Sequence, residues 1–110
     1  MTSVEPIPML TMETFDPLIA QDGVAVVEFF APWCAPCGMT EELLSELARE
    51  TPEDVRFYRV NADEQSALSD RYGVLSLPTI VLFRRGEERM KTVGPKSRRV
   101  LLQMIEEARG

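Results

Sequence analysis

The chain has 110 residues, 45% of them hydrophobic and 27% charged, with 18 acidic and 12 basic side chains and a formal net charge of −6. These proportions are those of an ordinary globular protein, and the length predicts a single domain over residues 1–110. The absence of histidine and the presence of only two cysteines exclude Ser-His-Asp and Cys-His catalytic groups and a complete zinc site built from this chain alone. The acidic balance argues against a nucleic-acid partner, because binding phosphates requires a basic face.

The charges are unevenly distributed along the chain. Residues 1–48 contain eight acidic and no basic side chains, whereas residues 49–110 are net basic. The N-terminal stretch MTSVEPIPMLTMETF has no basic residue ahead of an apolar run, so it does not resemble a secretory signal, and no apolar segment is long enough to span a bilayer. We therefore expect a cytoplasmic protein without membrane contact. A chain from which a leader had been removed would leave the same sequence.

The first half of the chain alternates between helix-like and strand-like segments. Residues 11–20 have helical apolar spacing with Thr11 as the N-cap candidate, and VAVVEFF at residues 24–30 is typical of a strand buried on both faces. From Cys37 onward a stripe of apolar side chains predicts an amphipathic helix of about three to four turns. The residues assigned to that stripe are Met39, Leu43, Leu44, Leu47 and Ala48.

The second half continues the alternation and closes with a hairpin. It predicts a strand at 55–60, a short helix at 66–72, a strand at 79–83 and an antiparallel partner strand at 88–93. A C-terminal helix follows, with an apolar stripe of Val100, Leu101, Met104, Ile105 and Ala108. The order of elements predicts an α/β fold with a mixed β-sheet and helices on both of its faces.

The two cysteines lie in the segment Trp33-Cys34-Ala35-Pro36-Cys37, between the first predicted strand and the amphipathic helix. Backbone N–H groups in the first turn of a helix have no intrahelical partner, so this position stabilises a thiolate. Pro36 suits that first turn. A thiolate attacks disulfides, and a second thiol three residues later can attack the resulting mixed disulfide and release the reduced substrate.

A bare C-x-x-C spacing leaves two other interpretations open. The pair could form half of a zinc or iron–sulfur site shared across a dimer, although the chain offers no other soft ligand. It could also form a structural disulfide, although a bridge that closes so short a loop removes little entropy from the unfolded state. We expect a redox function and no metal.

Three separated segments together resemble the thioredoxin family: VVEFFAPWCAPC, YGVLSLPTIVLFRRGE and the triplet Thr92-Val93-Gly94. The resemblance extends from about Thr11 to the C-terminus. It implies the thioredoxin fold and a protein-disulfide reductase in which Cys34 is the exposed nucleophile and Cys37 the resolving thiol. Electrons would come from an NADPH-dependent thioredoxin reductase. The chain itself would bind no cofactor, since it has no glycine-rich dinucleotide loop, and it would act as a monomer on disulfide-containing proteins.

The same resemblance assigns the substrate-binding residues. Pro78 of the Leu77-Pro78-Thr79 step would be preceded by a cis peptide bond, would pack beside the sulfurs and would leave the preceding backbone free to pair with an extended substrate. Gly94 would lie at the same groove. Without the resemblance, a trans bond is the default for a proline that precedes a strand. Trp33 either covers the active-site turn or packs into the core.

Glu28 is a carboxylate inside an apolar strand, where burial should raise its pKa. The family usually has an Asp here that accepts the proton of the resolving cysteine, so we expect Glu28 to act on Cys37 directly or through a water. Arg59 occupies the place of a frequent lysine partner and would oppose the rise in pKa. The alternative is a solvated Glu28 at the edge of the sheet.

The sequence also departs from the family pattern around the cysteines. Ala35 replaces a usual glycine, Gly38 stands where a cation is frequent, and Glu42 lies near the place of a helix-kinking proline. With Glu41 also nearby, we expect a Cys34 pKa no lower than that of an ordinary thioredoxin and a reducing potential. Two alternatives remain at this point: a thioredoxin-fold adaptor or chaperone-like module with an incidental dithiol, and an envelope thiol–disulfide oxidoreductase that lacks its leader.

Overall fold

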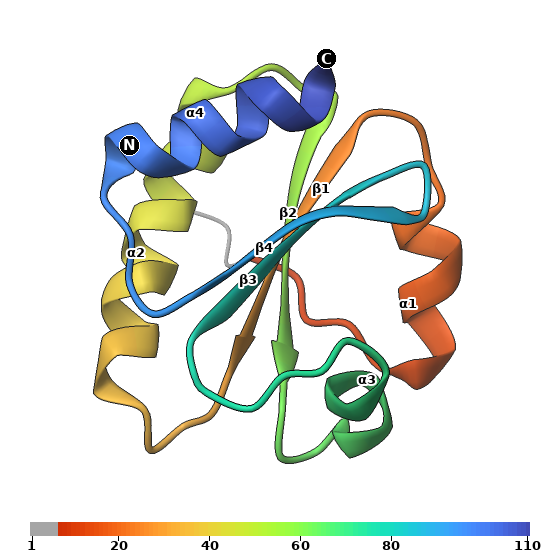
Figure 1. Ribbon diagram of the computed structural model, residues 1–110, viewed down its shortest axis with the longest axis vertical. Helices are drawn as coiled ribbons and strands as arrows, with labels where there is room; N and C mark the ends of the chain where they lie inside the picture. The colour runs from red at the N-terminus through yellow and green to blue at the C-terminus, as the bar shows by residue number, and fades with distance from the viewer. Residues whose placement is uncertain (1–6) are drawn as a thin grey trace, which may run out of the picture.

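The computed structural model describes residues 7–110 (Figure 1). Residues 1–6, which belong to the predicted domain and to the N-terminal stretch discussed above, lie outside the described residues. The elements in chain order are α1 (Met12–Ile19), β1 (Val24–Phe30), α2 (Ala35–Glu50), β2 (Val55–Asn61), α3 (Ser66–Arg71), β3 (Thr79–Arg84), β4 (Glu87–Val93) and α4 (Arg98–Arg109). Each predicted helix and strand is present, and the helix predicted from Cys37 begins two residues earlier, at Ala35.

The four strands form one mixed sheet in the order β2-β1-β3-β4. β1 runs parallel to β2 and antiparallel to β3, and β3 pairs antiparallel with β4 as the predicted hairpin. Helices α2 and α4 cover one face of the sheet, and α1 and α3 cover the other (Figure 1). This confirms the predicted α/β architecture. β1 is an interior strand, and all seven of its residues are buried.

Alternate side chains of β1 supply two apolar cores, one on each face of the sheet. Val24 and Val26 join the core beneath α2 and α4, whereas Ala25, Val27 and Phe29 join the core beneath α1 and α3. Glu28 follows Val26 by two residues on the same strand. Because side chains alternate along a strand, Glu28 faces α2.

The predicted apolar stripes of two helices are partly wrong. Met39 and Ala48 are exposed on α2, whose buried residues are Cys37, Thr40, Leu44 and Leu47. The prediction chose the apolar side chains as the inward face, but the helix turns Cys37 and the small polar Thr40 inward, and this rotation leaves Met39 outside. In α4, Val100 is exposed and the remaining four predicted residues are buried.

Two sets of contacts hold β2 in place. The outer edge of this strand pairs with residues 8–10: the Arg59 N–H donates to the Pro8 carbonyl at 3.0 Å, and the Leu10 N–H donates to the Arg59 carbonyl at 2.8 Å. Arg56, on the opposite face of the strand, donates through its guanidinium to carbonyls in the last turn of α1 and just after it.

Within residues 7–110, no helix is long and apolar enough to cross a membrane.

Candidate active site

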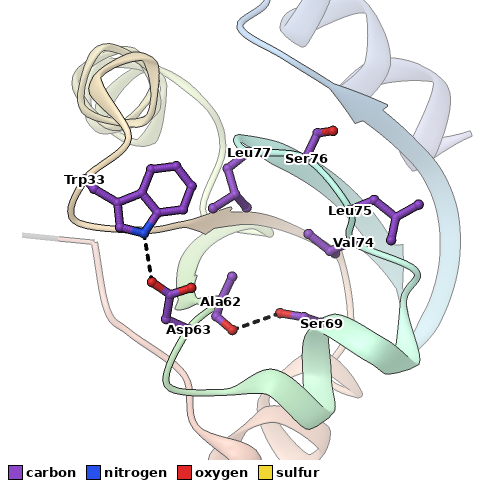
Figure 2. Close-up of a pocket in the computed structure, with 8 residues that line it drawn as sticks. All are labelled: Trp33, Ala62, Asp63, Ser69, Val74, Leu75, Ser76 and Leu77. Carbon is purple, nitrogen blue, oxygen red and sulfur yellow. Dashed lines mark hydrogen bonds between the residues drawn. The ribbon is translucent and has the colours of Figure 1, made fainter.

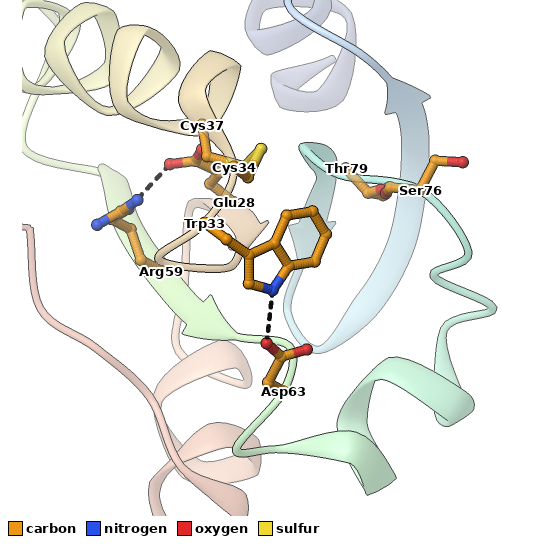
Figure 3. Close-up of a disulfide and its surroundings, with 8 residues drawn as sticks. All are labelled: Glu28, Trp33, Cys34, Cys37, Arg59, Asp63, Ser76 and Thr79. Atoms are coloured by element: carbon orange, nitrogen blue, oxygen red, sulfur yellow. Dashed lines mark hydrogen bonds and ion pairs between the residues drawn. A yellow bond between two sulfur atoms is a disulfide. The ribbon is translucent and has the colours of Figure 1, made fainter.

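Cys34 and Cys37 are joined by a disulfide at the start of α2, with their Cα atoms 5.4 Å apart (Figure 3). Cys34 is the N-cap residue, and the helix begins at Ala35 with Pro36 in its first turn. The Cys34 N–H donates to the Ala31 carbonyl at 3.1 Å, which closes the turn between β1 and α2. The N-terminal end of the helix therefore places its positive dipole end at the sulfurs.

The two cysteines differ in accessibility. The exposed fraction is 8% for Cys34 and 1% for Cys37. Both pack in a small apolar cluster with Phe30 and Ala31, and Leu77 lies against this cluster from the opposite loop. Cys34 is therefore the more accessible of the two cysteines, and Cys37 is almost completely shielded.

Glu28 lies on β1 and is completely buried, at 0% exposure. The alternative of a solvated carboxylate at the sheet edge is therefore wrong. Its register partner on β2 is Arg59, and the Arg59 Nε donates to Glu28 Oε1 at 2.9 Å (Figure 3). The other oxygen, Oε2, is buried and has no hydrogen-bond partner among residues 7–110.

Arg59 also interacts with two groups besides Glu28. Its Nη1 lies 3.3 Å from Oε2 of Glu41 on α2, and its guanidinium carbon lies 3.6 Å from the centre of the Phe30 ring. Burial raises the pKa of Glu28 to about 7, the charge and hydrogen bond of Arg59 oppose that rise, and the negative charge of Glu41 adds to it. Glu28 can thus exchange a proton near neutral pH.

Trp33 is 72% exposed, so the alternative of a ring packed in the core is wrong. Its indole Nε1–H donates to Asp63 Oδ2 at 2.9 Å, and this hydrogen bond fixes the ring beside the active-site turn (Figures 2 and 3). Asp63 follows β2, the strand parallel to β1, so both residues come from loops at the same end of the sheet.

The loop before β3 approaches the same end of the sheet. The Leu77-Pro78 peptide bond is cis. The Pro78 carbonyl accepts a hydrogen bond from the Gly94 N–H at 2.8 Å, and the Thr79 hydroxyl donates to the Ser76 carbonyl at 2.6 Å. Gly94 has a φ of +87°, a backbone conformation that favours glycine. The residue before β3 is therefore hydrogen-bonded to the residue after β4, next to Leu77, which packs against the cysteines.

A groove of about 260 Å³ lies between Trp33 and the loop that leads to β3 (Figure 2). Leu75 on its rim is 96% exposed. The other lining residues are Ala62, Asp63, Ser69, Val74, Ser76 and Leu77. Two large apolar side chains, Trp33 and Leu75, thus border an open groove that also contacts Leu77, the residue packed on the sulfurs.

The fold brings the predicted site residues to one end of the sheet. The prediction did not include Asp63 and Leu75, and it considered Glu41 only as part of the acidic surroundings of the cysteines. Asp63 could have been found from its position just after β2, because residues that follow neighbouring parallel strands meet at one edge. Glu41 lies four residues after Cys37 on the same helix, a spacing that places both on one face. Leu75 carries no sequence signal, since an isolated leucine in a loop is ordinary. Among residues 7–110, no group of three or more His, Cys, Asp and Glu side chains could hold a metal ion.

Comparison with known proteins agrees with this geometry. The family model described as Thioredoxin matches residues 6–107. A thioredoxin of Chlamydia pneumoniae is 40% identical over 97 residues, which cover 88% of this chain and 93% of that protein. A chloroplastic M-type thioredoxin of Brassica napus is 36% identical over 101 residues, covering 91% of this chain and 57% of that protein. The chain thus spans little more than half of the length of this plant relative.

Solved structures show the same similarity. The N21Q mutant thioredoxin from Halobacterium salinarum superposes with a TM-score of 0.88 at 31% identity, covering 100% of this chain and 96% of that chain. The oxidised mitochondrial thioredoxin 3 of Saccharomyces cerevisiae gives a TM-score of 0.83 at 33% identity, covering 92% and 94%. The match over residues 6–107, together with the dithiol at the start of α2, shows that this chain belongs to the thioredoxin family.

Proposed function

We propose that this chain reduces protein disulfides by thiol–disulfide exchange. The observation that supports this most directly is the position of the Cys34–Cys37 disulfide: it lies in the first turn of α2, on the face of the sheet that contains the buried Glu28. The helix end favours a thiolate, and the buried carboxyl can accept a proton near neutral pH. Both favour a two-step exchange between dithiol and disulfide.

In the first step, the Cys34 thiolate of the reduced protein attacks one sulfur of the substrate disulfide. The substrate S–S bond breaks, a mixed disulfide forms on Cys34, and the departing substrate thiolate takes a proton from solvent. Cys34 is assigned this role because it is the more exposed of the two cysteines. The attacking sulfur must approach in line with the S–S bond of the substrate, and this requires a cysteine that the substrate can reach.

In the second step, Cys37 gives its proton to the ionised Glu28 and attacks the Cys34 sulfur. The mixed disulfide breaks, the Cys34–Cys37 disulfide forms, and the second substrate sulfur leaves as a thiolate that is then protonated. The substrate has gained two electrons and this chain has lost two. The free oxygen of Glu28, which has no partner among residues 7–110, is the atom available to receive the proton directly or through a water.

The substrate segment would lie across the loop before β3. We assign its backbone to the exposed edge of the Ser76-Leu77 segment next to Pro78, and a flanking apolar side chain to the groove between Trp33 and Leu75. The hydrogen bond from Gly94 to the Pro78 carbonyl and that from Thr79 to the Ser76 carbonyl position this loop. Main-chain pairing gives affinity without strong sequence preference, which suits a reductase of many proteins.

The electron donor in this proposal is an NADPH-dependent thioredoxin reductase, and the site of action is the cytoplasm. The donor is supported by membership of the family, and the location by similarity to a bacterial thioredoxin. Some relatives are named chloroplastic and another is a bacterial thioredoxin. Cell fractionation with an antibody against this chain tests the location, and a membrane-enclosed compartment would contradict it.

The activity is tested by reduction of insulin disulfides with a thioredoxin reductase and NADPH. We expect turnover by the wild-type chain and none by Cys34→Ser. Cys37→Ser should accumulate mixed disulfides that Cys34→Ser does not form, because only the first variant keeps the attacking thiol. Full reduction of insulin by Cys34→Ser would refute the assignment. Unchanged binding of a partner by that variant, without any reductase activity in the wild type, would favour an adaptor.

A further inference from the structure

Arg59 is shared between two carboxylates that come from different elements. Its Nε lies 2.9 Å from Glu28 Oε1 on β1, and its Nη1 lies 3.3 Å from Glu41 Oε2 on α2. Glu28 is buried, whereas Glu41 is partly exposed. One guanidinium therefore connects an interior carboxylate to a carboxylate at the protein surface. Figure 3 shows the contact of Arg59 with the interior carboxylate, Glu28.

The position of the guanidinium is fixed by contacts other than the two carboxylates. The Arg59 backbone is bonded on one side to β1 and on the other to the segment around Pro8 and Leu10. Its planar group lies over the Phe30 ring at 3.6 Å from the centre, in the geometry of a cation–π contact. Removal of Glu41 would thus leave Arg59 in place beside Glu28.

Few charged groups face Glu28. Arg59 approaches from β2, Glu41 belongs to α2, and the Cys34–Cys37 disulfide lies at the start of the same helix. The register partner on β3 is Ile80, which is neutral. Arg59 thus supplies a single positive charge against two carboxylates, and the second oxygen of Glu28 has no partner within residues 7–110.

We propose that Glu41 is a positioning residue for the reaction: by sharing the Arg59 guanidinium, it prevents Arg59 from fully neutralising Glu28. This inference rests on the proposed function of Glu28 as proton acceptor. Glu41 is not one of the reacting groups: it acts through Arg59 and through its own charge. The ion pair with Glu41 weakens the attraction of the same guanidinium for Glu28, and the negative charge of Glu41 also disfavours ionisation of Glu28 directly.

Both effects act in the same direction. They keep the pKa of Glu28 high, in agreement with the raising influence of Glu41 noted above. A carboxylate with a higher pKa is a stronger base, and a base works best when its pKa is near the working pH. Glu41 would therefore sustain proton transfer from Cys37 near neutral pH, although it lies outside the reacting groups.

The test is a titration of Glu28 by NMR in the oxidised protein labelled with ¹³C at glutamate carboxyls, where no thiol ionises. Glu41→Gln is compared with the wild type and with Glu42→Gln. Glu42 is the neighbouring exposed residue, so its replacement makes the same change in charge. We expect Glu41→Gln to lower the pKa of Glu28 by on the order of 0.5–1 unit. Glu42→Gln should lower it by much less.

The kinetic counterpart is the pH dependence of mixed-disulfide resolution, measured by stopped flow. In Glu41→Gln its midpoint should fall by the same amount as the Glu28 titration, and in Glu42→Gln it should stay near the wild-type value. Equal titrations in the two variants, or a rise in Glu41→Gln, would overturn the proposal. The titration needs no activity, so a wild-type chain that fails to reduce insulin contradicts the proposed function separately from the Glu41 coupling.

Discussion

Two arginines three residues apart on β2 show how the same side chain serves opposite purposes on the two faces of one sheet. Arg56 faces α1 and donates to the carbonyls of Leu18, Gln21 and Asp22. Arg59 faces α2 and interacts with two carboxylates. The odd spacing along a strand places the two side chains on opposite faces.

The difference lies in whether the partners can titrate. Carbonyl oxygens do not ionise between pH 4 and 8, so the contribution of Arg56, which donates to carbonyls in the last turn of α1 and just after it, is constant over that range. Carboxylates do ionise, so the contribution of Arg59 depends on pH and on which partner holds the proton. The face with carbonyls contributes to stability, and the face with carboxylates is the one on which the proposed proton exchange takes place. Three substitutions test this division, and a fourth tests the groove beside the active site.

The largest expected effect is on the pH dependence of stability in Glu28→Gln. The folded-state pKa of Glu28 is raised from 4.5 to about 7, so between these values the unfolded chain releases a proton that the folded chain keeps, and stability falls as pH rises. The loss is complete above pH 7 and amounts to roughly 3 kcal/mol at 1.36 kcal/mol per unit.

Gln does not titrate, so the free energy of unfolding of oxidised Glu28→Gln should exceed that of the wild type by an amount that grows from pH 4.5 to about 7. Urea unfolding at several pH values measures this difference, in which most other titrations cancel. A difference that stays flat from pH 4 to 8 would mean that Glu28 ionises at its ordinary pKa.

The same variant should slow the second chemical step. General-base assistance is typically worth 100-fold or more, so we expect Glu28→Gln to resolve mixed disulfides about 100-fold more slowly at pH 7, while the attack by Cys34 changes little. Stopped-flow measurement of the two phases separates them. An unchanged resolution rate with an unchanged pH profile would show that another group takes the proton of Cys37.

Arg56→Met tests the other face. Removing the donor to three carbonyls should lower the free energy of unfolding by about 2 kcal/mol, because water replaces only part of the hydrogen bonding that the guanidinium gives to them. The loss should be equal at pH 5 and pH 8, and the reductase rate of the folded protein should not change. Arg59→Met is the matched variant, whose loss of stability should grow with pH as Glu28 ionises without its partner. If the loss of stability depended on pH in the same way in both variants, the two faces of the strand would not differ as described.

The smallest effect is expected for Leu75→Ser. Loss of one exposed apolar contact in the groove should raise the KM for a protein disulfide a few-fold, on the order of 1 kcal/mol, without altering stability or the rate with a small aromatic disulfide. A parallel assay with both substrates decides this. If both rates fall together, Leu75 contributes to the structure of the loop and not to substrate binding.

The sequence predicted the architecture well because its signals were local. Apolar runs such as residues 24–30 and turn residues such as Gly73 and Gly94 mark the elements, and a carboxylate inside such a run identified Glu28 as unusual. The cis state at Pro78 was expected only from the family resemblance, since local preference favours trans.

The rest depends on how elements rotate against one another, which no local pattern encodes. The inward face of α2 includes Thr40 and excludes Met39, contrary to the apolar stripe. The same rotation points Glu41 at Arg59, so Glu41, first seen as part of an acidic neighbourhood, is paired with a cation. Its role could be predicted only once the orientation of the helix was known.

The pairing of residues 8–10 with the edge of β2 has a practical consequence for anyone who handles this protein. The hydrogen bonds of Pro8 and Leu10 hold the backbone of the residue whose side chain sets the charge balance at Glu28. A truncation that removes this segment, or a purification tag that pulls it from the sheet edge, should alter the redox kinetics of a site that lies across the strand. Comparable assays therefore require an identical N-terminus in every variant.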